Sequence, residues 1–306
     1  RKDILASRQV LPGYLAVTLP TANIGKVDNK GYEISVKWED SLKDFRYNVG
    51  VNLSYAKNTR IFMDEIPKPY DYMAETGTPV GQSFGYKFDG YFTEEESANY
   101  ASEKGKTMPD YGTGFAPNAG DVKYKDLNGD KLIDYRDEAA IGYPVYPLLT
   151  GGVNLGLSYK GFDISMTWSG ATKTSRMLQQ IYREPFGEQN NKSLLTYLVD
   201  NAWTPEKGNS AKAPRISFQN KKHNYQASDL WLRDASYLRL KNLEIGYTLP
   251  TAWMKKMNVN QLRIYISGYN LLTFDSLDVL DPEMTNTLNP SYPLIKVVNL
   301  GLKLSF

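Results

Sequence analysis

Residues 149–168 read LTGGVNLGLSYKGFDISMTW, and this stretch decides the fold. Its side chains alternate between apolar and polar on both sides of the pair Lys160-Gly161. A period of two residues is typical of a β-strand with one apolar and one polar face. Two residues suffice to connect antiparallel strands, so the stretch predicts a hairpin. Its apolar face carries Leu149, Gly151, Val153, Leu155, Leu157, Tyr159, Phe162, Ile164, Met166 and Trp168.

The same alternation recurs along the chain and predicts about seven strands between residue 31 and the last residue. The period slips after Leu240, and one extra residue near Lys241-Asn242 would mark a β-bulge. The alternative is a strand that begins only at residue 242. The further alternating segments are 32–38, 45–55, 243–249, 262–266 and 298–306.

Strand length and aromatic side chains favour a membrane β-barrel over a soluble β-sandwich. The segments are about ten residues long, which suits tilted strands across a bilayer, whereas strands in globular proteins are usually nearer five or six. Aromatic residues cluster at the segment ends, where an amphipathic ring suits a membrane boundary. They are Tyr32, Trp38, Tyr55, Tyr159, Phe162, Trp168, Tyr247 and Phe306.

The lengths of the connections favour the barrel most strongly. Short turns at 40–44, 160–161 and 250–260 alternate with long connections over about 58–147, 170–235 and 273–292. Outer-membrane barrels have short periplasmic turns and long extracellular loops. We therefore predict an all-β fold, part of a large antiparallel transmembrane barrel. Seven strands leave open edges that lipid does not tolerate, so we expect further strands from outside residues 1–306.

Composition excludes several classes of function. Lys and Arg number 36 against 34 Asp and Glu, and the net charge of +2 argues against a nucleic-acid partner. The absence of Cys excludes disulfides, zinc–thiolate sites and thiol nucleophiles. The single histidine, His223, lies in a polar stretch where we expect it to be exposed and not catalytic. We therefore expect no enzyme activity.

Several blocks of sequence, in this order, resemble SusC/RagA-type TonB-linked outer-membrane proteins, and the likeness covers nearly all of the chain. The blocks are 23–27 (NIGKV), 29–33 (NKGYE), 79–81 (PVG), 85–90 (GYKFDG), 120–130 (GDVKYKDLNGD), 231–242 (WLRDASYLRLKN), 262–271 (LRIYISGYNL) and the terminal Phe306.

The resemblance implies that residues 1–306 form the C-terminal part of a 22-strand barrel in a Gram-negative outer membrane. The N-terminal plug, the TonB-contacting segment and the early strands would lie outside this sequence. It also implies import of oligosaccharides or peptides, driven through TonB, with a SusD-like surface lipoprotein as partner. Of these two substrate classes, the resemblance to this family favours oligosaccharides over peptides.

Residues 126–137 (DLNGDKLIDYRD) match the spacing of a calcium loop of the EF-hand type. Position 6 holds Lys131 where glycine is usual, and position 12 holds Asp where a bidentate Glu is usual. The sequence therefore predicts either a weak Ca²⁺ site, with affinity on the order of 0.1–1 mM, or an ion-free surface turn rich in Asp and Asn. The predicted ligands are Asp126, Asn128, Asp130, Leu132 through its carbonyl, Asp134 and Asp137.

Three aromatic residues in the long connections are candidates for stacking on a sugar ring: Tyr182, Trp203 and Trp231. The alternative for each is ordinary packing within the loops. The leading prediction is a nutrient transporter of the outer membrane. The alternative is a secreted all-β carbohydrate-binding module with a calcium-stabilised loop.

Overall fold

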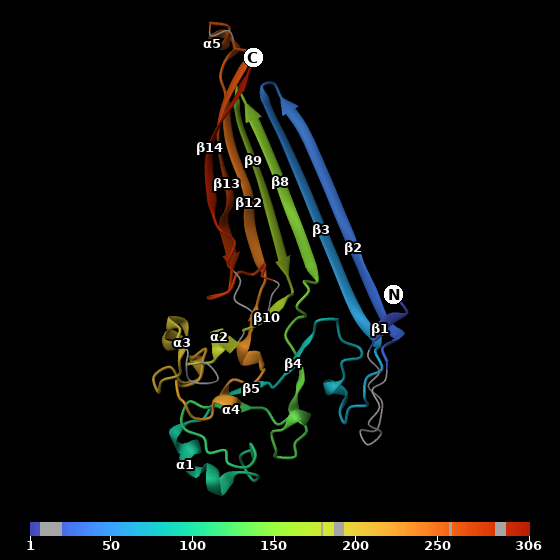
Figure 1. Cartoon of the computed structure of the whole chain (residues 1–306), viewed down its shortest axis with the longest axis vertical. Coiled ribbons are helices and arrows are strands. Elements are labelled where there is room, and N and C mark those ends of the chain that lie inside the picture. Colours follow the sequence, from blue (N-terminus) through green and yellow to red (C-terminus); the bar gives the residue numbers. More distant parts are fainter. Residues whose placement is uncertain (7–19, 179, 187–192, 257–258, 285–291) are drawn as a thin grey trace.

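The computed structural model describes residues 1–6, 20–178, 180–186, 193–256, 259–284 and 292–306. Eight strands form one antiparallel sheet in the order β1-β2-β3-β8-β9-β12-β13-β14 (Figure 1). The prediction of a mainly antiparallel β fold is confirmed. The strands are β1 (Ile4–Ala6), β2 (Ala22–Leu42), β3 (Phe45–Phe62), β8 (Leu149–Tyr159), β9 (Phe162–Thr172), β12 (Tyr237–Thr248), β13 (Gln261–Asp275) and β14 (Val297–Ser305).

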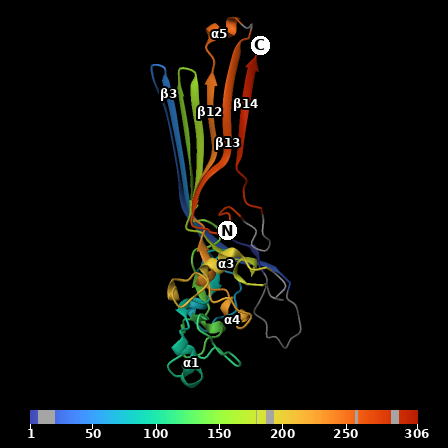
Figure 2. The same cartoon turned by 90° about the vertical axis from the view of Figure 1, so that its left-hand side faces the viewer.

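The short and long connections lie at opposite ends of this sheet (Figure 1). The turn between β2 and β3, the turn between β8 and β9, and helix α5 (Thr251–Lys256) lie at one end, which we call the tight-turn end. The long connections leave from the other end, which we call the loop end. Figure 2 shows the same separation from the side. Of the third long connection, residues 285–291 lie outside the described residues.

The strand register places side chains of one kind in rows across the sheet. An apolar row runs through Val36, Val51, Val153, Trp168 and Leu240. The next row is polar and runs through Lys37, Gly50, Asn154, Thr167 and Asn242. Between Leu240 and Asn242 the register shifts, which confirms the predicted bulge at Lys241.

The apolar face of the sheet is exposed. Leu300 on β14 is 78% exposed, and Val36 and Trp38 on β2 are similarly open. A soluble sandwich would cover such a face with a second sheet. Within the described residues, the other sheets have only two short strands each, so this face has no protein cover of that kind.

Within the part of the chain that the structure describes, no helix is both long and apolar enough to cross a membrane.

The first two long connections fold together into one body, the loop unit, which we define as residues 63–148 and 173–236. Its core contains Tyr91, Tyr124, Leu178 and Trp231, so both connections contribute. The run Gly81–Phe88 lies within the predicted long connection over 58–147, belongs to this body and does not cross the sheet. Its short elements are β4 (Ser83–Gly85), β5 (Phe88–Tyr91), α1 (Glu94–Glu103), β6 (Val122–Tyr124), β7 (Ala139–Ile141), β10 (Ser175–Met177), α2 (Gln180–Arg183), α3 (Thr196–Asn201), α4 (Lys221–Asn224) and β11 (Leu232–Asp234), with single 3₁₀ turns at 71–73, 135–137, 208–210 and 229–231.

Helix α1 shows how local sequence fixes the loop unit. The Thr93 hydroxyl accepts a hydrogen bond from the Glu96 backbone N–H at 3.1 Å, and the Glu96 carboxylate accepts one from the Thr93 N–H at 2.9 Å. This capping box satisfies two N–H groups that would otherwise lack partners at the start of a helix. Lys123 of β6 also pairs with Glu96, at 2.7 Å, and so fixes the helix against the core.

Candidate functional site

The polar face of the sheet carries hydrogen-bonding side chains and two hollows. A hollow of about 750 Å³ near the tight-turn end is lined by Glu39, Arg46, Asn48 and Asp163, among others. A second hollow, of about 500 Å³, lies further along the strands and is lined partly by Asn52. Polar and charged groups in such hollows suit a hydrophilic solute, because they replace the hydrogen bonds that it makes with water.

Glycines on this face make room for long polar side chains. A Cβ atom at Gly156 would lie 2.6 Å from the Asn48 side-chain nitrogen, and one at Gly246 would lie 2.3 Å from the Arg263 guanidinium. Both distances are shorter than real contacts allow. Gly246 therefore lets Arg263 lie across β12 and reach the strand beyond it, which explains a small residue inside a strand.

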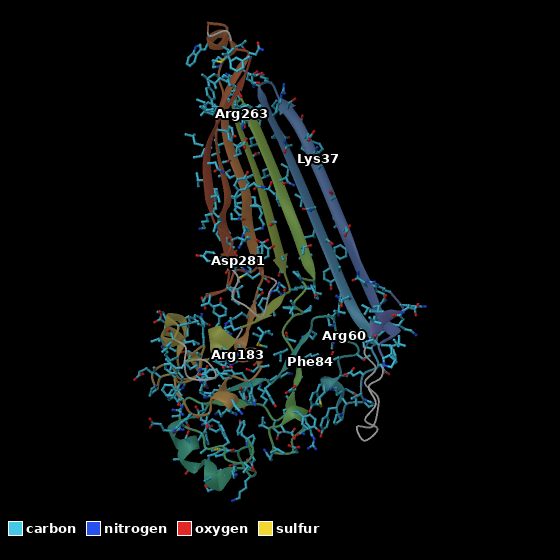
Figure 3. All side chains as sticks on the ribbon, in the orientation of Figure 1. Lys37, Arg60, Phe84, Arg183, Arg263 and Asp281 are labelled. Carbon is cyan, nitrogen blue, oxygen red and sulfur yellow. The ribbon has the colours of Figure 1, made fainter. Side chains whose placement is uncertain are left out.

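An ion-pair cluster around Arg263 links three strands, and Figure 3 shows Arg263 near the tight-turn end. Arg263 of β13 donates from Nε to Asp163 of β9 at 3.0 Å and from Nη2 to Glu244 of β12 at 2.6 Å. Asp163 and Arg263 lie 100 residues apart in the sequence. The cluster fixes the charge distribution of the polar face, since the guanidinium is shared between two carboxylates.

Inside the loop unit, Asp121 joins the two long connections. Its carboxylate is 0% exposed. It accepts hydrogen bonds from Arg215 Nε at 2.8 Å, Asn224 Nδ2 at 2.9 Å and Asn220 Nδ2 at 2.6 Å. A charge buried to this degree needs such partners, and removing one of them is costly. Asp121 therefore holds the second long connection against the first.

His223 is largely buried, so our expectation that it is exposed is wrong. Its Nε2 lies 2.6 Å from the Val122 carbonyl oxygen, and the ring packs against Phe115 at 4.2 Å and Tyr111 at 4.9 Å between centroids. Burial lowers the pKa of its imidazole. The polar neighbours of His223 in the sequence concealed this environment, because α4 turns the histidine ring into an aromatic pocket on the first connection.

The three aromatic candidates occupy different environments. Trp231 is 0% exposed, and its Nε1–H donates to the Asn224 carbonyl at 3.1 Å. A fully buried ring has no free face for a sugar, so the structure corrects this candidate in favour of the packing alternative. Trp203 and Tyr182 are partly buried against the same core. Tyr182 also lines a pocket at the loop end, and both remain predictions.

The predicted calcium loop folds as a turn bonded to its own backbone. Asp126 accepts from the N–H groups of Gly129 and Lys131, and Asp137 accepts from those of Leu127 and Asp134. Lys131 adopts the left-handed conformation, with φ of 64°, that its place at position 6 demands.

The loop offers many oxygen atoms that could ligate a metal ion, but its Asp126 and Asp137 carboxylates point towards backbone N–H groups. Burial raises the pKa of Asp137, and the nearby charges of Asp126 and Asp130 add to the effect. In the described residues, no group of three or more acidic or histidine side chains converges as a metal site requires. Binding would therefore need these carboxylates to turn, and Ca²⁺ stays a prediction.

Sequence reasoning missed two charged clusters: the one around Arg263 and a second around Arg239 of β12. A signal was present, because both arginines stand at polar-face positions of strands. Their partners could not be read from the sequence, since the pairing depends on the register and on how a distant loop folds back.

No family model matches this chain. Among curated proteins, it is similar to TonB-dependent receptor P3 of Formosa agariphila, with 28% identity over 331 aligned positions that cover 100% of this chain and 31% of that protein. It is also similar to TonB-dependent receptor SusC of Bacteroides thetaiotaomicron, with 24% identity, 99% of this chain and 29% of that protein. The chain thus spans about a third of the length of these relatives.

Solved structures share the fold. The RagAB peptide importer in its open-open state superposes with a TM-score of 0.71 at 21% identity, covering 100% of this chain and 31% of that chain. Its closed-closed state gives a TM-score of 0.69 at 22% identity. The predicted resemblance to SusC/RagA-type TonB-dependent receptors is thereby confirmed.

Proposed function

From this similarity to TonB-dependent receptors of the SusC/RagA type, we propose that the chain forms part of the barrel wall of an outer-membrane importer. The proposal rests on one observation: the sheet has an exposed apolar face on one side and a polar face with hollows on the other. In a bilayer, the apolar face would contact lipid and the polar face would line the path of the solute.

The dimensions of the strands support this placement. Strands β8 and β9 have 11 residues each. At about 3.3 Å per residue and a tilt of about 45°, they span roughly 25 Å along the membrane normal, the height of the apolar band in such barrels. The tight-turn end would then face the periplasm and the loop unit would face outward.

We further propose that the solute is large and hydrophilic, with oligosaccharides favoured over peptides, and that import is driven through TonB. The partner would be a SusD-like lipoprotein seated on the loop unit. The alternative, a secreted carbohydrate-binding module with a calcium-stabilised loop, has less support, because a water-soluble module would not leave the apolar face of the sheet uncovered.

Uptake by cells tests the proposal. Cells that make the protein are given fluorescently labelled malto-oligosaccharides or ten-residue peptides, with and without a proton uncoupler. We expect accumulation that the uncoupler abolishes and that cells without the gene do not show. Equal accumulation in both strains, or recovery of the protein as a soluble monomer in the culture medium, would contradict the proposal.

A further inference from the structure

Two β-bulges lie side by side at the loop end of strands β12 and β13. Against β9, strand β12 carries Lys241 as an extra residue between the pairs Leu240–Trp168 and Asn242–Thr167. Against β13, the same place on β12 faces two residues, Asn270 and Leu271. A bulge re-aims side chains that regular pairing would separate. These two bulges meet where the third long connection begins.

The bulge on β12 brings two cations to one carboxylate. Arg239, on the polar face two residues before Lys241, is 2% exposed and pairs with Glu283 and with Asp281, the latter at 2.8 Å. Lys241 Nζ contacts both oxygens of Glu283 at 2.6 Å. Arg239 Nε also donates to Thr273 of β13 at 2.9 Å, which fixes the guanidinium against the wall.

The two carboxylates belong to one turn, which Asp281 also organises. Asp281 accepts from the backbone N–H of Glu283 at 2.9 Å and from that of Leu294 at 3.3 Å. Figure 3 places Asp281 where the strands meet the loop unit. Asp281 therefore holds the turn over 281–284 together, and both carboxylates hold it to the strand wall.

Further contacts hold this connection to its surroundings. Arg176 of β10 donates from Nε to the Met284 carbonyl at 3.3 Å, and Asn270 donates to the Ile295 carbonyl at 3.2 Å. Val279 and Leu280 pack against the core of the loop unit. A pocket of about 390 Å³ lies between this connection and the strands, with Tyr182 and Arg239 in its lining.

We propose that Arg239 and Lys241 are positioning residues that hold residues 276–284 against the polar face as a fixed constriction. The argument is the burial of the pairs. Arg239 is 3% exposed and its partners Asp281 and Glu283 are 7% and 21% exposed, and Glu283 also pairs with Lys241. Removing the Glu283 charge therefore leaves both cations without their shared partner, next to the strand wall. Asp278 of the same connection pairs with Lys212 of the loop unit; this pair is exposed and contributes little, which makes Asp278 a matched control.

The test uses the absence of cysteine from the sequence. A Leu280→Cys substitution places one thiol on the connection, and its rate of reaction with a maleimide reports how firmly the segment is held. In outer-membrane vesicles, we expect Glu283→Gln to raise this rate at least tenfold and Asp278→Asn to change it less than twofold. A rate that stays within twofold in Glu283→Gln overturns the proposal.

A second variant and a second reporter separate loss of the anchor from general unfolding. Lys241→Gln should give a smaller rise than Glu283→Gln, because Arg239 keeps both carboxylates. A thiol at Asp44→Cys, in a tight turn at the far end, should react equally in all variants. Equal acceleration at both reporter sites would mean that the strands themselves had unfolded, and the anchoring role would be rejected.

The consequence for transport rests on the proposed function and is read separately. Release of the segment should widen the path, so that Glu283→Gln cells accumulate longer labelled oligosaccharides than parent cells do. An unchanged size limit despite faster labelling rejects the constriction but leaves the importer intact. If parent cells take up no probe, the importer fails, while the labelling rates still decide the anchor.

Discussion

The sheet and the loop unit treat the same kinds of side chain in opposite ways. On the sheet, Leu300 is 78% exposed, whereas in the loop unit Trp231 is 0% exposed. The polar groups are reversed as well: Asn154 lies open on the polar face, while Asp121 is buried among its partners. The loop unit has its own apolar core. The apolar face of the sheet, in contrast, is exposed at the surface of the protein. A chain with both arrangements suits a boundary between water and lipid.

The largest expected effect is on the loop unit. Trp231→Ala removes the largest fully buried side chain in the described residues, and such deletions cost about 3–5 kcal/mol because a cavity remains. Leu300→Ala on the exposed face leaves no cavity, so in lipid it should cost less, about 1–2 kcal/mol, for the apolar side-chain atoms that no longer leave water for lipid. Hydrogen exchange of the loop-unit amides measures the first change, and urea unfolding in lipid vesicles measures the second. Similar costs for both would remove the distinction between the two regions.

The next effect separates the two faces of a single strand. Leu155→Arg places a charge on the apolar face near the middle of β8 and should cost about 2–4 kcal/mol in a bilayer. Asn154→Arg, one residue earlier on the polar face, should cost little, because the neighbouring Gly50 leaves room for it. Folding equilibria of both variants in lipid vesicles provide the comparison. Equal tolerance would show that lipid does not cover the apolar face.

These faces were predictable because successive side chains of a strand point to opposite faces. The polarity of every second residue therefore indicates the environment of one face. The alternation around Leu155 and the slip at Lys241 needed no tertiary information, and both predictions are confirmed. The partners of Arg263 and the burial of His223 depend on segments about 100 residues away. Local sequence contains no record of such contacts. The fold was therefore more predictable than the clusters of side chains that it brings together.

Calcium should act on the loop unit alone. If residues 126–137 bind Ca²⁺ with affinity on the order of 0.1–1 mM, then 10 mM Ca²⁺ stabilises this region by about 1.4–2.7 kcal/mol. Asp126→Asn should remove most of the gain, while Glu33→Gln on the polar face of the sheet should leave it unchanged. Proteolysis of the loop unit with and without Ca²⁺ measures the effect. Identical digestion rates would assign the loop to the ion-free turn.

The smallest expected effect is a pH dependence carried by His223. Because burial lowers its pKa, the folded loop unit favours the neutral imidazole, and the unfolded chain binds a proton more readily. The stability that the loop unit gains from a neutral His223 is therefore present at pH values above about 6.5, the usual histidine pKa. This stability is lost as the pH falls below that value. One such group changes stability by at most about 1.4 kcal/mol per pH unit. Hydrogen exchange of the loop unit between pH 7.5 and 5 measures the slope.

The groups around His223 fix the sign of this effect. Asp121 favours the charged imidazole, but burial outweighs it. Tyr111 and Tyr124 have raised pKa values and stay neutral throughout this range. His223→Gln should flatten the slope, while the strands, which lack histidine, should show the same pH response in both proteins. If the stability of the loop unit still changes with pH to the same extent in His223→Gln, other groups cause the pH dependence. The loop unit and the sheet would then not differ in pH response because of His223.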